Sequence, residues 1–418
     1  MRLTTIWDCC YCNRIGIISS VQLIPLKLCK MAENANNILQ LFHQQFAEEP
    51  QLFFSPGRMN LIGEHIDYND GFVLPAAINK GIWIAIAPNQ SNLIHCIAAD
   101  INDFLIIDVN NIKKQQGWKN YILGVLHVLQ QEHKNIRGFH CVFGGNLPHG
   151  AGLSSSAAIE AGFLFALNHI FSLQLNLLQM ALLAQQAEHS YPGVQCGIMD
   201  MYANLFGKNE HAILLDCVSL QHKWVPLLLS QHEIVLINSA VHHSLASGEY
   251  NKRRAECKEG LNVLSAVPGY GNSFRNITPQ MVKQQQALLP EIIYNRCLYV
   301  VEEMERVQLA ANYLQQNNIA AFGSLLYQTH HDLQHLYEVS CSEIDYLVQQ
   351  AKQHKAVIGA RLMGGGFGGT VICIIEKQAA QNIVQEIVNN YRQKFNIQAE
   401  AYFVQPASGT HWVPINAE

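Results

Sequence analysis

Charged residues are scarce in this chain, and neither sign dominates. Only 14% of the 418 residues are charged, with 27 Lys and Arg against 32 Asp and Glu and a formal net charge of −5. Nucleic-acid-binding domains usually carry a basic excess, so we expect no nucleic-acid partner. Because 49% of the residues are hydrophobic, the chain is too apolar to be disordered, and its length favours two domains.

Long uninterrupted apolar runs are also missing. The stretch 161–187 contains no Asp, Glu, Lys or Arg, but asparagine, glutamine and histidine recur along it every few residues. Such side chains are costly in hydrocarbon, and a membrane-spanning helix needs about 18 to 20 apolar residues in succession. We therefore interpret this stretch as two buried helices and expect no membrane partner.

The cysteines do not form a metal-binding set. Four of the 12 lie in the first thirty residues, where Cys9 and Cys12 make a C-x-x-C motif with no second pair of ligands nearby. A structural zinc ion normally has four ligands. The other cysteines are scattered among apolar neighbours, which favours reduced, buried thiols and a cytoplasmic location.

Residues 1–30 differ from the rest of the chain. They carry four basic residues and a single acidic one, Asp8, and their apolar stretches follow neither a helical nor a strand period. A targeting sequence is one interpretation, although no small-residue cleavage site follows the apolar run. A helical pattern starts only after Met31, so we prefer a non-native or disordered extension over 1–30, with Met31 as the working start.

Helix and strand patterns alternate irregularly after Met31. The first hundred residues are rich in strand patterns, and Ile82, Ile84 and Ile86 alternate there with smaller or aromatic neighbours. Helical spacing then appears at 118–133 and 157–171, polar helices dominate 249–353, and a second αβ unit closes the chain. This mixture predicts an α+β protein with a first domain over 31–220 and a second over 221–418.

The segment 144–160 has the features of a phosphate site. It leaves a strand, turns through Gly150 and Gly152, and enters a helix whose first turn carries Ser154, Ser155 and Ser156. Unpaired amides at a helix start, with small residues and hydroxyls beside them, suit an anion, although a serine-capped helix is the structural alternative. No Gly-Lys-Ser/Thr follows, so the loop is not a Walker loop and has no lysine to neutralise the phosphates of a nucleotide. A magnesium ion held by a hydroxyl and a carboxylate would neutralise their charge.

Two further segments concentrate glycine or charge. The run 364–369 contains G-x-G-x-x-G, but the strand pattern after it excludes a dinucleotide-binding loop, and its glycines indicate close approach to a neighbouring loop or a ligand. Residues 57–71 bring carboxylates, an arginine and a histidine onto one short loop, which suits a polyhydroxylated molecule. Asp200 lies among apolar and sulfur-containing neighbours, where a helix cap and a catalytic role are equally favoured.

Six motifs together resemble the galactokinase family of the GHMP kinases, the sugar and small-metabolite kinases that also include homoserine, mevalonate and phosphomevalonate kinases. In chain order they are SPGRMNLIGEHIDYNDGFVLPAAI, LPHGAGLSSSAA, AEHSYPGVQCGIMD, SGEYNKRRAEC, YEVSCSEID and GARLMGGGFGG, from residue 55 to residue 369. The resemblance implies a ribosomal-protein-like N-terminal domain that binds sugar and ATP, a ferredoxin-like C-terminal domain, and an active site between them. It further implies ATP-dependent phosphorylation of the anomeric hydroxyl of galactose, the first committed step of galactose catabolism.

The same resemblance assigns roles to individual residues. Asp200 would orient or deprotonate the hydroxyl, and Arg58 would keep Asp200 ionised and stabilise the transition state. The residues that would bind the sugar hydroxyls are Glu64, His65, Asp67 and Tyr250. Those that would bind the ATP phosphates are Gly150, Ala151, Gly152, Leu153, Ser154, Ser155 and Ser156. Trp118 would contact the adenine, and Ser156 and Glu188 would bind Mg²⁺. We expect galactose and ATP as ligands and no obligatory protein partner.

Three positions depart from the family pattern without removing a proposed ligand. Ile66 stands where threonine is usual, Met201 where glutamine is common, and Met363 where threonine is usual. These changes bear on the shape of the sugar pocket, so N-acetylgalactosamine or L-arabinose kinase activity is an alternative. A non-catalytic galactose and ATP sensor is another, but the intact run 154–158 favours catalysis.

Overall fold

The computed structural model describes residues 34–148, 152–242 and 246–415. Residues 1–30, the predicted start at Met31, and Gly150 and Ala151 of the phosphate loop lie outside these ranges.

The first sheet has six strands, in the order β13 (His411–Val413), β1 (Gln51–Asn60), β3 (Pro75–Pro88), β6 (Phe139–Gly145), β4 (Leu93–Ala98) and β5 (Asp103–Asp108). Its neighbours run antiparallel except β4 and β6, which are parallel.

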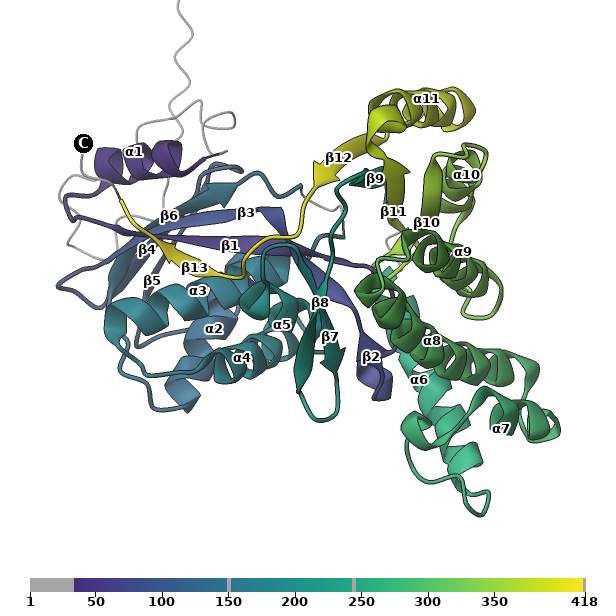
Figure 1. Cartoon of the computed structure of the whole chain (residues 1–418). Helices are drawn as coiled ribbons and strands as arrows, with labels where there is room; N and C mark the ends of the chain where they lie inside the picture. Colours follow the sequence, from purple (N-terminus) through teal and green to yellow (C-terminus); the bar gives the residue numbers. More distant parts are fainter. Residues whose placement is uncertain (1–33, 149–151, 243–245, 416–418) are drawn as a thin grey trace, which may run out of the picture.

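Helices cover both faces of this sheet (Figure 1). One face carries α1, which contacts β3 and β6. The other face carries α3, which contacts β1 and β3 and is itself packed against α2, α4 and α5. The five helices are α1 (Ala35–Gln45), α2 (Lys119–Gln131), α3 (Ser155–Phe171), α4 (Leu177–Ser190) and α5 (Met199–Phe206).

The side chains of β3 explain why the sheet is covered on both sides. Successive residues of a strand point to opposite faces. Ile84 and Ile86 join the large core beneath the helix layer, whereas Ala85 and Ala87 join a smaller core against α1. The predicted alternation in this strand is therefore confirmed, and small residues on the α1 side allow that helix to approach closely.

The second domain is built on a four-stranded antiparallel sheet, shown on the right of Figure 1. Its strand order is β10 (Val357–Met363), β11 (Gly368–Glu376), β9 (His232–His242) and β12 (Glu400–Val404). The glycine run joins β10 to β11, as the strand pattern after it predicts. The accompanying helices are α6 (Ala246–Ser265), α7 (Pro279–Gln284), α8 (Glu291–Gln315), α9 (Ile319–His335), α10 (Ser342–Lys352) and α11 (Lys377–Phe395).

The chain crosses between the two halves more than once. A small sheet of β2 (Phe72–Val73), β7 (His211–Asp216) and β8 (His222–Pro226) spans the predicted boundary at 220. The yellow strand β13 in Figure 1 returns to pair with β1 in the first sheet. Both β8 and β13 thus pair with strands of the first half, although the predicted division places them in 221–418. Each of these two strands is too short for its hydrophobic pattern to indicate which strand it pairs with.

The two predicted helices in 161–187 are present as α3 and α4. Among the helices that the structure describes, none has both the length and the apolar character to cross a membrane.

The loop after β1 is fixed to the second domain by buried hydrogen bonds. The Gly63 amide donates to Glu303 Oε1 at 2.8 Å, and the Tyr299 hydroxyl donates to the Glu64 carbonyl at 2.9 Å. Arg361 Nε donates to the Leu61 carbonyl at 2.8 Å. Buried polar groups without partners are costly, so these bonds hold the loop in one conformation at the domain interface.

Candidate active site

Arg58 and Asp200 meet at the domain interface, although 142 positions separate them. Arg58 lies near the end of β1, and Asp200 lies in the first turn of α5. Nε and Nη2 of Arg58 donate to Oδ1 and Oδ2 of Asp200 at 2.7 and 2.8 Å, which is a bidentate pair. α5 has no side-chain cap, so the helix-cap interpretation of Asp200 is wrong.

The same pair contacts the phosphate loop. Arg58 Nη1 donates to the Gly152 carbonyl at 2.6 Å, and the Ser154 hydroxyl donates to Asp200 Oδ2. Ser154 stands at the N-cap of α3 without making a capping bond, so this serine does not have the structural role considered as the alternative. Burial disfavours the charged Arg58, but Asp200 outweighs it and raises the pKa of Arg58 above its usual value.

A cavity of about 500 Å³ opens beside this pair. It lies between the loop after β1, the segment before α5, and the glycine run of the second domain. Its polar lining comes mainly from residues that the sequence assigned to sugar and catalysis, namely Arg58, Glu64, His65, Asp67, Asp200 and Tyr250. A pocket that presents several carboxylates beside apolar side chains such as Val194 and Met199 suits a ligand with many hydroxyls.

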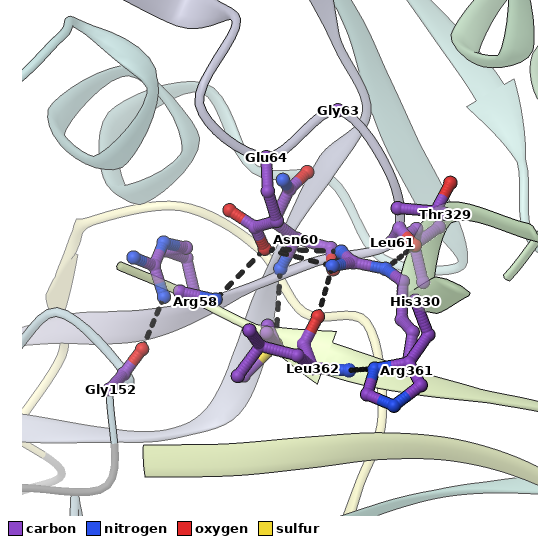
Figure 2. A network of polar contacts seen from close by, with 12 residues as sticks. Arg58, Asn60, Leu61, Gly63, Glu64, Gly152, Thr329, His330, Arg361 and Leu362 are labelled. Atoms are coloured by element: carbon purple, nitrogen blue, oxygen red, sulfur yellow. Dashed lines mark hydrogen bonds and ion pairs between the residues drawn. The ribbon is translucent and has the colours of Figure 1, made fainter. Parts of the chain in front are cut away.

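Glu64 is held in this cavity by Arg361 of β10, as Figure 2 shows. Both terminal nitrogens of Arg361 lie 3.1 Å from Glu64 Oε1, and the Gly364 amide donates to the same oxygen at 2.9 Å. Arg361 is fully buried and also donates to backbone carbonyls of both domains. Three donors on one oxygen fix the rotamer of Glu64.

Within the described residues, Asp67 makes no ion pair of this kind, and Arg58 interacts with it only through its charge. Burial raises the pKa of Asp67 to about 7, and the negative charges of Asp200 and Glu64 act in the same direction. Gly197 lies against this carboxylate so closely that a Cβ at that position would overlap Asp67 Oδ2 and Cγ. The glycine is therefore required for Asp67 to face the cavity.

His65 and Tyr250 form an aromatic part of the cavity lining. Their rings are 5.4 Å apart, and the Tyr250 ring also lies beside Gly365. His65 Nδ1 is 2.8 Å from the Tyr68 hydroxyl. Burial lowers the pKa of His65 to about 3, and the charge of Arg253 acts in the same direction, so the imidazole is neutral near pH 7.

A second cavity of about 480 Å³ adjoins the first, because Pro192 and Val194 line both. Its walls include Trp118, Tyr121 and Phe143. Trp118 packs on Phe143 with ring centroids 5.3 Å apart, and its Nε1 donates to Asp103 at 2.8 Å. An apolar, aromatic cavity of this size next to a phosphate loop fits a nucleoside base.

A buried carboxyl pair lies behind the phosphate loop. Ser156 and Glu160 both lie beside the Glu188 carboxyl, although neither Glu160 oxygen has a hydrogen-bond partner among the described residues. Glu160 is fully buried, and burial together with Glu188 raises its pKa well above the usual range, so Glu160 keeps its proton. Glu188 Oε2 is buried and has no hydrogen-bond partner among the described residues.

This donor set fits a magnesium ion. A serine hydroxyl and an unpartnered carboxylate oxygen are the hard oxygen ligands that Mg²⁺ prefers, and Mg²⁺ normally takes few protein ligands beside phosphates and water. Within the described ranges, no group of three or more His, Cys, Asp or Glu could hold a metal alone. A site completed by nucleotide phosphates agrees with both observations.

Models of three families match separate parts of the chain. They are the galactokinase galactose-binding signature over residues 40–88, the GHMP kinases N terminal domain over 120–208 and the GHMP kinases C terminal over 310–393. The galactokinase of Thermotoga neapolitana is 39% identical over 355 residues, covering 85% of this chain and 98% of that protein. The galactokinase of Clostridium perfringens is 35% identical over 380 residues, covering 90% and 98%. The chain belongs to the galactokinase family.

A solved member of the galactokinase family has the same fold. The crystal structure of Lactococcus lactis galactokinase complexed with galactose matches with a TM-score of 0.86 and 30% identity, covering 90% of this chain and 99% of that chain. The Methanococcus jannaschii mevalonate kinase shares the fold at 17% identity, with a TM-score of 0.59. The predicted family, the two-domain α+β fold and the kinase class are therefore confirmed.

The structure brings most of the predicted galactokinase residues to one place. The first cavity collects the sugar and catalytic set, Trp118 and Ser155 line the second, and Ser156 meets Glu188 behind the loop. Gly152 contacts Arg58, and Leu153 is buried in the core. These positions agree with the predicted roles, and the roles themselves stay predictions.

Three residues that complete the site were missed by the sequence reasoning. Arg361 and Gly197 lie inside the quoted motifs, but nothing local shows that they contact Glu64 and Asp67. Glu160 follows the serine run, and its only signal is a carboxylate on an otherwise apolar helix. Each acts through a partner distant in sequence, which residue spacing does not indicate.

We predict that Gly197→Ala weakens galactose binding selectively. The new methyl group displaces the Asp67 carboxylate, so the KM for galactose should rise on the order of tenfold or more while the KM for ATP stays unchanged. Steady-state kinetics with each substrate varied will measure both. Gly248→Ala is the matched control, because a Cβ there meets open space. An unchanged KM for galactose in Gly197→Ala would refute the proposed contact.

We predict that Asp67→Asn stabilises the protein at alkaline pH. The carboxyl has an ordinary pKa of 3.8 and a raised pKa of about 7 in the folded protein. Between these values only the unfolded chain loses the proton, so this group's stabilising contribution falls as pH rises to about 7 and then levels off. The melting temperature of Asp67→Asn should exceed that of the wild type at pH 8 and match it near pH 4. An equal difference in melting temperature between variant and wild type at both pH values would contradict this prediction. Asp108→Asn, at an exposed position, is the control.

Proposed function

We propose that this chain transfers the γ-phosphoryl group of ATP to the anomeric hydroxyl of galactose, producing galactose 1-phosphate and ADP. One observation carries the proposal: the Arg58–Asp200 pair lies in a hydroxyl-binding cavity and contacts the phosphate loop of the adjoining aromatic cavity. The galactose bound to the Lactococcus lactis relative supports the choice of sugar. The product begins galactose catabolism.

The sugar occupies the first cavity through its hydroxyl groups. Glu64, Asp67 and the neutral His65 provide acceptors and a donor on different sides, and Tyr250 supplies a further hydroxyl. Because Arg361 and Gly364 hold one oxygen of Glu64, this carboxylate keeps a fixed orientation toward the sugar. Fixed polar groups lower the entropy cost of aligning the anomeric oxygen with phosphorus.

Asp200 and Arg58 act at the reacting atoms. The anomeric oxygen attacks the γ-phosphorus, the bond to the ADP oxygen breaks, and the hydroxyl proton passes to Asp200. Arg58 orients Asp200 before the transfer and stabilises the negative charge on the phosphoryl oxygens during it. The buried position of Arg58, 6% exposed, strengthens that electrostatic effect because little water screens it.

The phosphate loop and the metal residues bind ATP on the other side. Trp118 lines the base cavity, and residues 152–156 lie at the start of α3, where free backbone amides favour phosphate oxygens. Ser156 and Glu188 would hold Mg²⁺, which supplies charge neutralisation across the phosphates when bound. Glu160, fully buried beside Glu188, limits the positions that the Glu188 carboxyl can take.

The cellular setting follows from the cysteines and the substrates. The eight described cysteines are all free thiols, which supports the reducing cytoplasm as the location of the enzyme. ATP is the co-substrate, and no protein partner is required for the site.

We predict that both members of the pair are needed for turnover. In an assay coupled to ADP release, galactose should be the best substrate of a panel with glucose, N-acetylgalactosamine and L-arabinose. Arg58→Ala should lose on the order of a hundredfold or more in kcat, because transition-state charge is no longer stabilised. Asp200→Asn should show a comparable loss.

Exposed Arg392→Ala and Asp108→Asn control for the loss of one surface charge. Near-normal turnover in Arg58→Ala and Asp200→Asn would refute the catalytic assignment. Binding of galactose and ATP without ADP release by the wild type would instead establish a sensor, and a preference for another sugar would correct the substrate.

A further inference from the structure

A segment that has left the second domain lies against α5, the helix that carries the catalytic aspartate. This return segment, residues 405–410, joins β12 to β13 and is drawn in yellow in Figure 1. The Gly409 amide donates to the carbonyl of Gly207, the residue after α5, at 2.8 Å. The Thr410 amide donates to the carbonyl of Asn204, within α5, at 2.8 Å. The backbone of the return segment is therefore bonded to the C-terminal half of α5.

The side chain of Asn204 joins α5 to β1 and to the return segment. It is 1% exposed and lies one helical turn after Asp200. Its Nδ2 donates to the Pro56 carbonyl of β1, and its Oδ1 accepts from the Thr410 hydroxyl at 2.6 Å. The Ser55 hydroxyl of β1 lies 3.2 Å from the same oxygen. One buried amide thus connects three segments that are far apart in the sequence.

The chemistry of the partners fixes the orientation of this amide. A backbone carbonyl can only accept, so the nitrogen of Asn204 must face Pro56 and the oxygen must face the hydroxyls. The Ser55 hydroxyl has the Ala158 carbonyl at 2.7 Å for its single proton. The Thr410 hydroxyl is closer to Oδ1, at 2.6 Å, than to the Asn204 carbonyl, at 3.2 Å, and therefore donates to Oδ1. None of these side-chain atoms is buried without a partner.

α5 is too short to hold its position alone. It has eight residues and no side-chain cap, and isolated helices of fewer than about 12 residues are marginal in water. Four positions separate Asp200 from Asn204, so both lie on the same face of the helix. The first bonds to Arg58 of β1 and the second to Pro56. The register of β1 with β3 shifts between Pro56 and Arg58, and such irregularities re-aim side chains. The amide thus holds β1 just before the point where Arg58 turns to Asp200.

We propose that Asn204 and Thr410 are positioning residues that align Asp200 with Arg58. Neither residue lines the sugar cavity or the base cavity, so both act on the reaction through the pair. Because Thr410 follows the second domain in the chain, the catalytic pair of the first domain is completed by a segment near the C-terminus. This inference rests on the proposed function and deepens it, since it names the residues that set the geometry of its catalytic pair.

We predict that Thr410→Val lowers kcat on the order of tenfold and leaves the KM values for galactose and ATP within about twofold of the wild type. Valine keeps the shape of threonine but cannot donate to Asn204, so the amide can turn and α5 can shift relative to β1. Thr410→Ser keeps the hydroxyl and should retain nearly the wild-type kcat. Steady-state kinetics with each substrate varied measure these values.

Tyr391→Phe is the matched control for the loss of one buried hydroxyl. It removes the bond to the Ser239 carbonyl at 2.9 Å, which lies in the second domain. The melting temperature should fall in Tyr391→Phe and in Thr410→Val, whereas kcat should fall only in Thr410→Val. Asn204→Leu removes every hydrogen bond of the amide and should lower kcat further than Thr410→Val does. If Asn204→Leu does not fold, the Thr410 variants still decide the proposal.

A double-mutant cycle distinguishes positioning from general structural damage. If Thr410 acts through the Asp200 carboxylate, Thr410→Val should change the residual kcat of Asp200→Asn by less than about twofold, because that carboxylate is already absent. Damage that is not transmitted through Asp200 would lower kcat by the same factor in both backgrounds. Such an equal loss, or an unchanged kcat in Thr410→Val, would overturn the proposal.

Crystal structures keep this test separate from the test of the proposed function. Inactivity of the wild type with every sugar would refute the proposed function. Structures of the wild type and of Thr410→Val would then still decide the positioning role, because we expect the bidentate contact of Arg58 with Asp200 to lengthen or to lose one of its two bonds in the variant. An identical pair in both structures would overturn the proposal.

Discussion

The structure depends on the capture of one loop by the opposite domain. Residues 60–71 leave the first sheet, and buried groups of the second domain bind their backbone: Arg361 at Leu61, Glu303 at Gly63 and Tyr299 at Glu64. A backbone held at successive points cannot move without leaving buried polar groups unpaired. The loop therefore carries its carboxylates and imidazole as a rigid set, and the cavity exists only where the domains meet.

Charge balance explains how three carboxylates fit into one small cavity. Asp200 is paired with Arg58, and Glu64 is paired with Arg361, so each of these carboxylates lies beside a buried cation. Asp67 has no arginine of its own, and its raised pKa reflects burial beside the other two charges. The site thus stores unfavourable electrostatic energy at Asp67, which lines the cavity.

The sequence predicted the residues that share a short motif and left out those that act across the interface. Arg58, Glu64, His65 and Asp67 lie within ten positions of one another, so one loop places them together. Arg361 is 297 positions from Glu64 and Tyr337 is 269 from Tyr68, and no local period encodes such contacts.

The same limit applies to the fold. The alternation of β3 and the amphipathic helices could be predicted because each is a local pattern of burial. The return of β13 to the first sheet could not, because the pairing of a three-residue strand is decided by the space left beside β1. Pairing partners of this kind are set by tertiary packing.

The central claim is that Arg58 and Asp200 meet the anomeric oxygen and the γ-phosphate at a single point. The most direct test is a crystal structure with galactose, Mg²⁺ and a non-hydrolysable ATP analogue bound together. We expect the anomeric oxygen within hydrogen-bonding distance of Asp200, with Arg58 contacting the γ-phosphate. A sugar bound with another hydroxyl at Asp200, or a γ-phosphate out of reach of Arg58, would contradict the account.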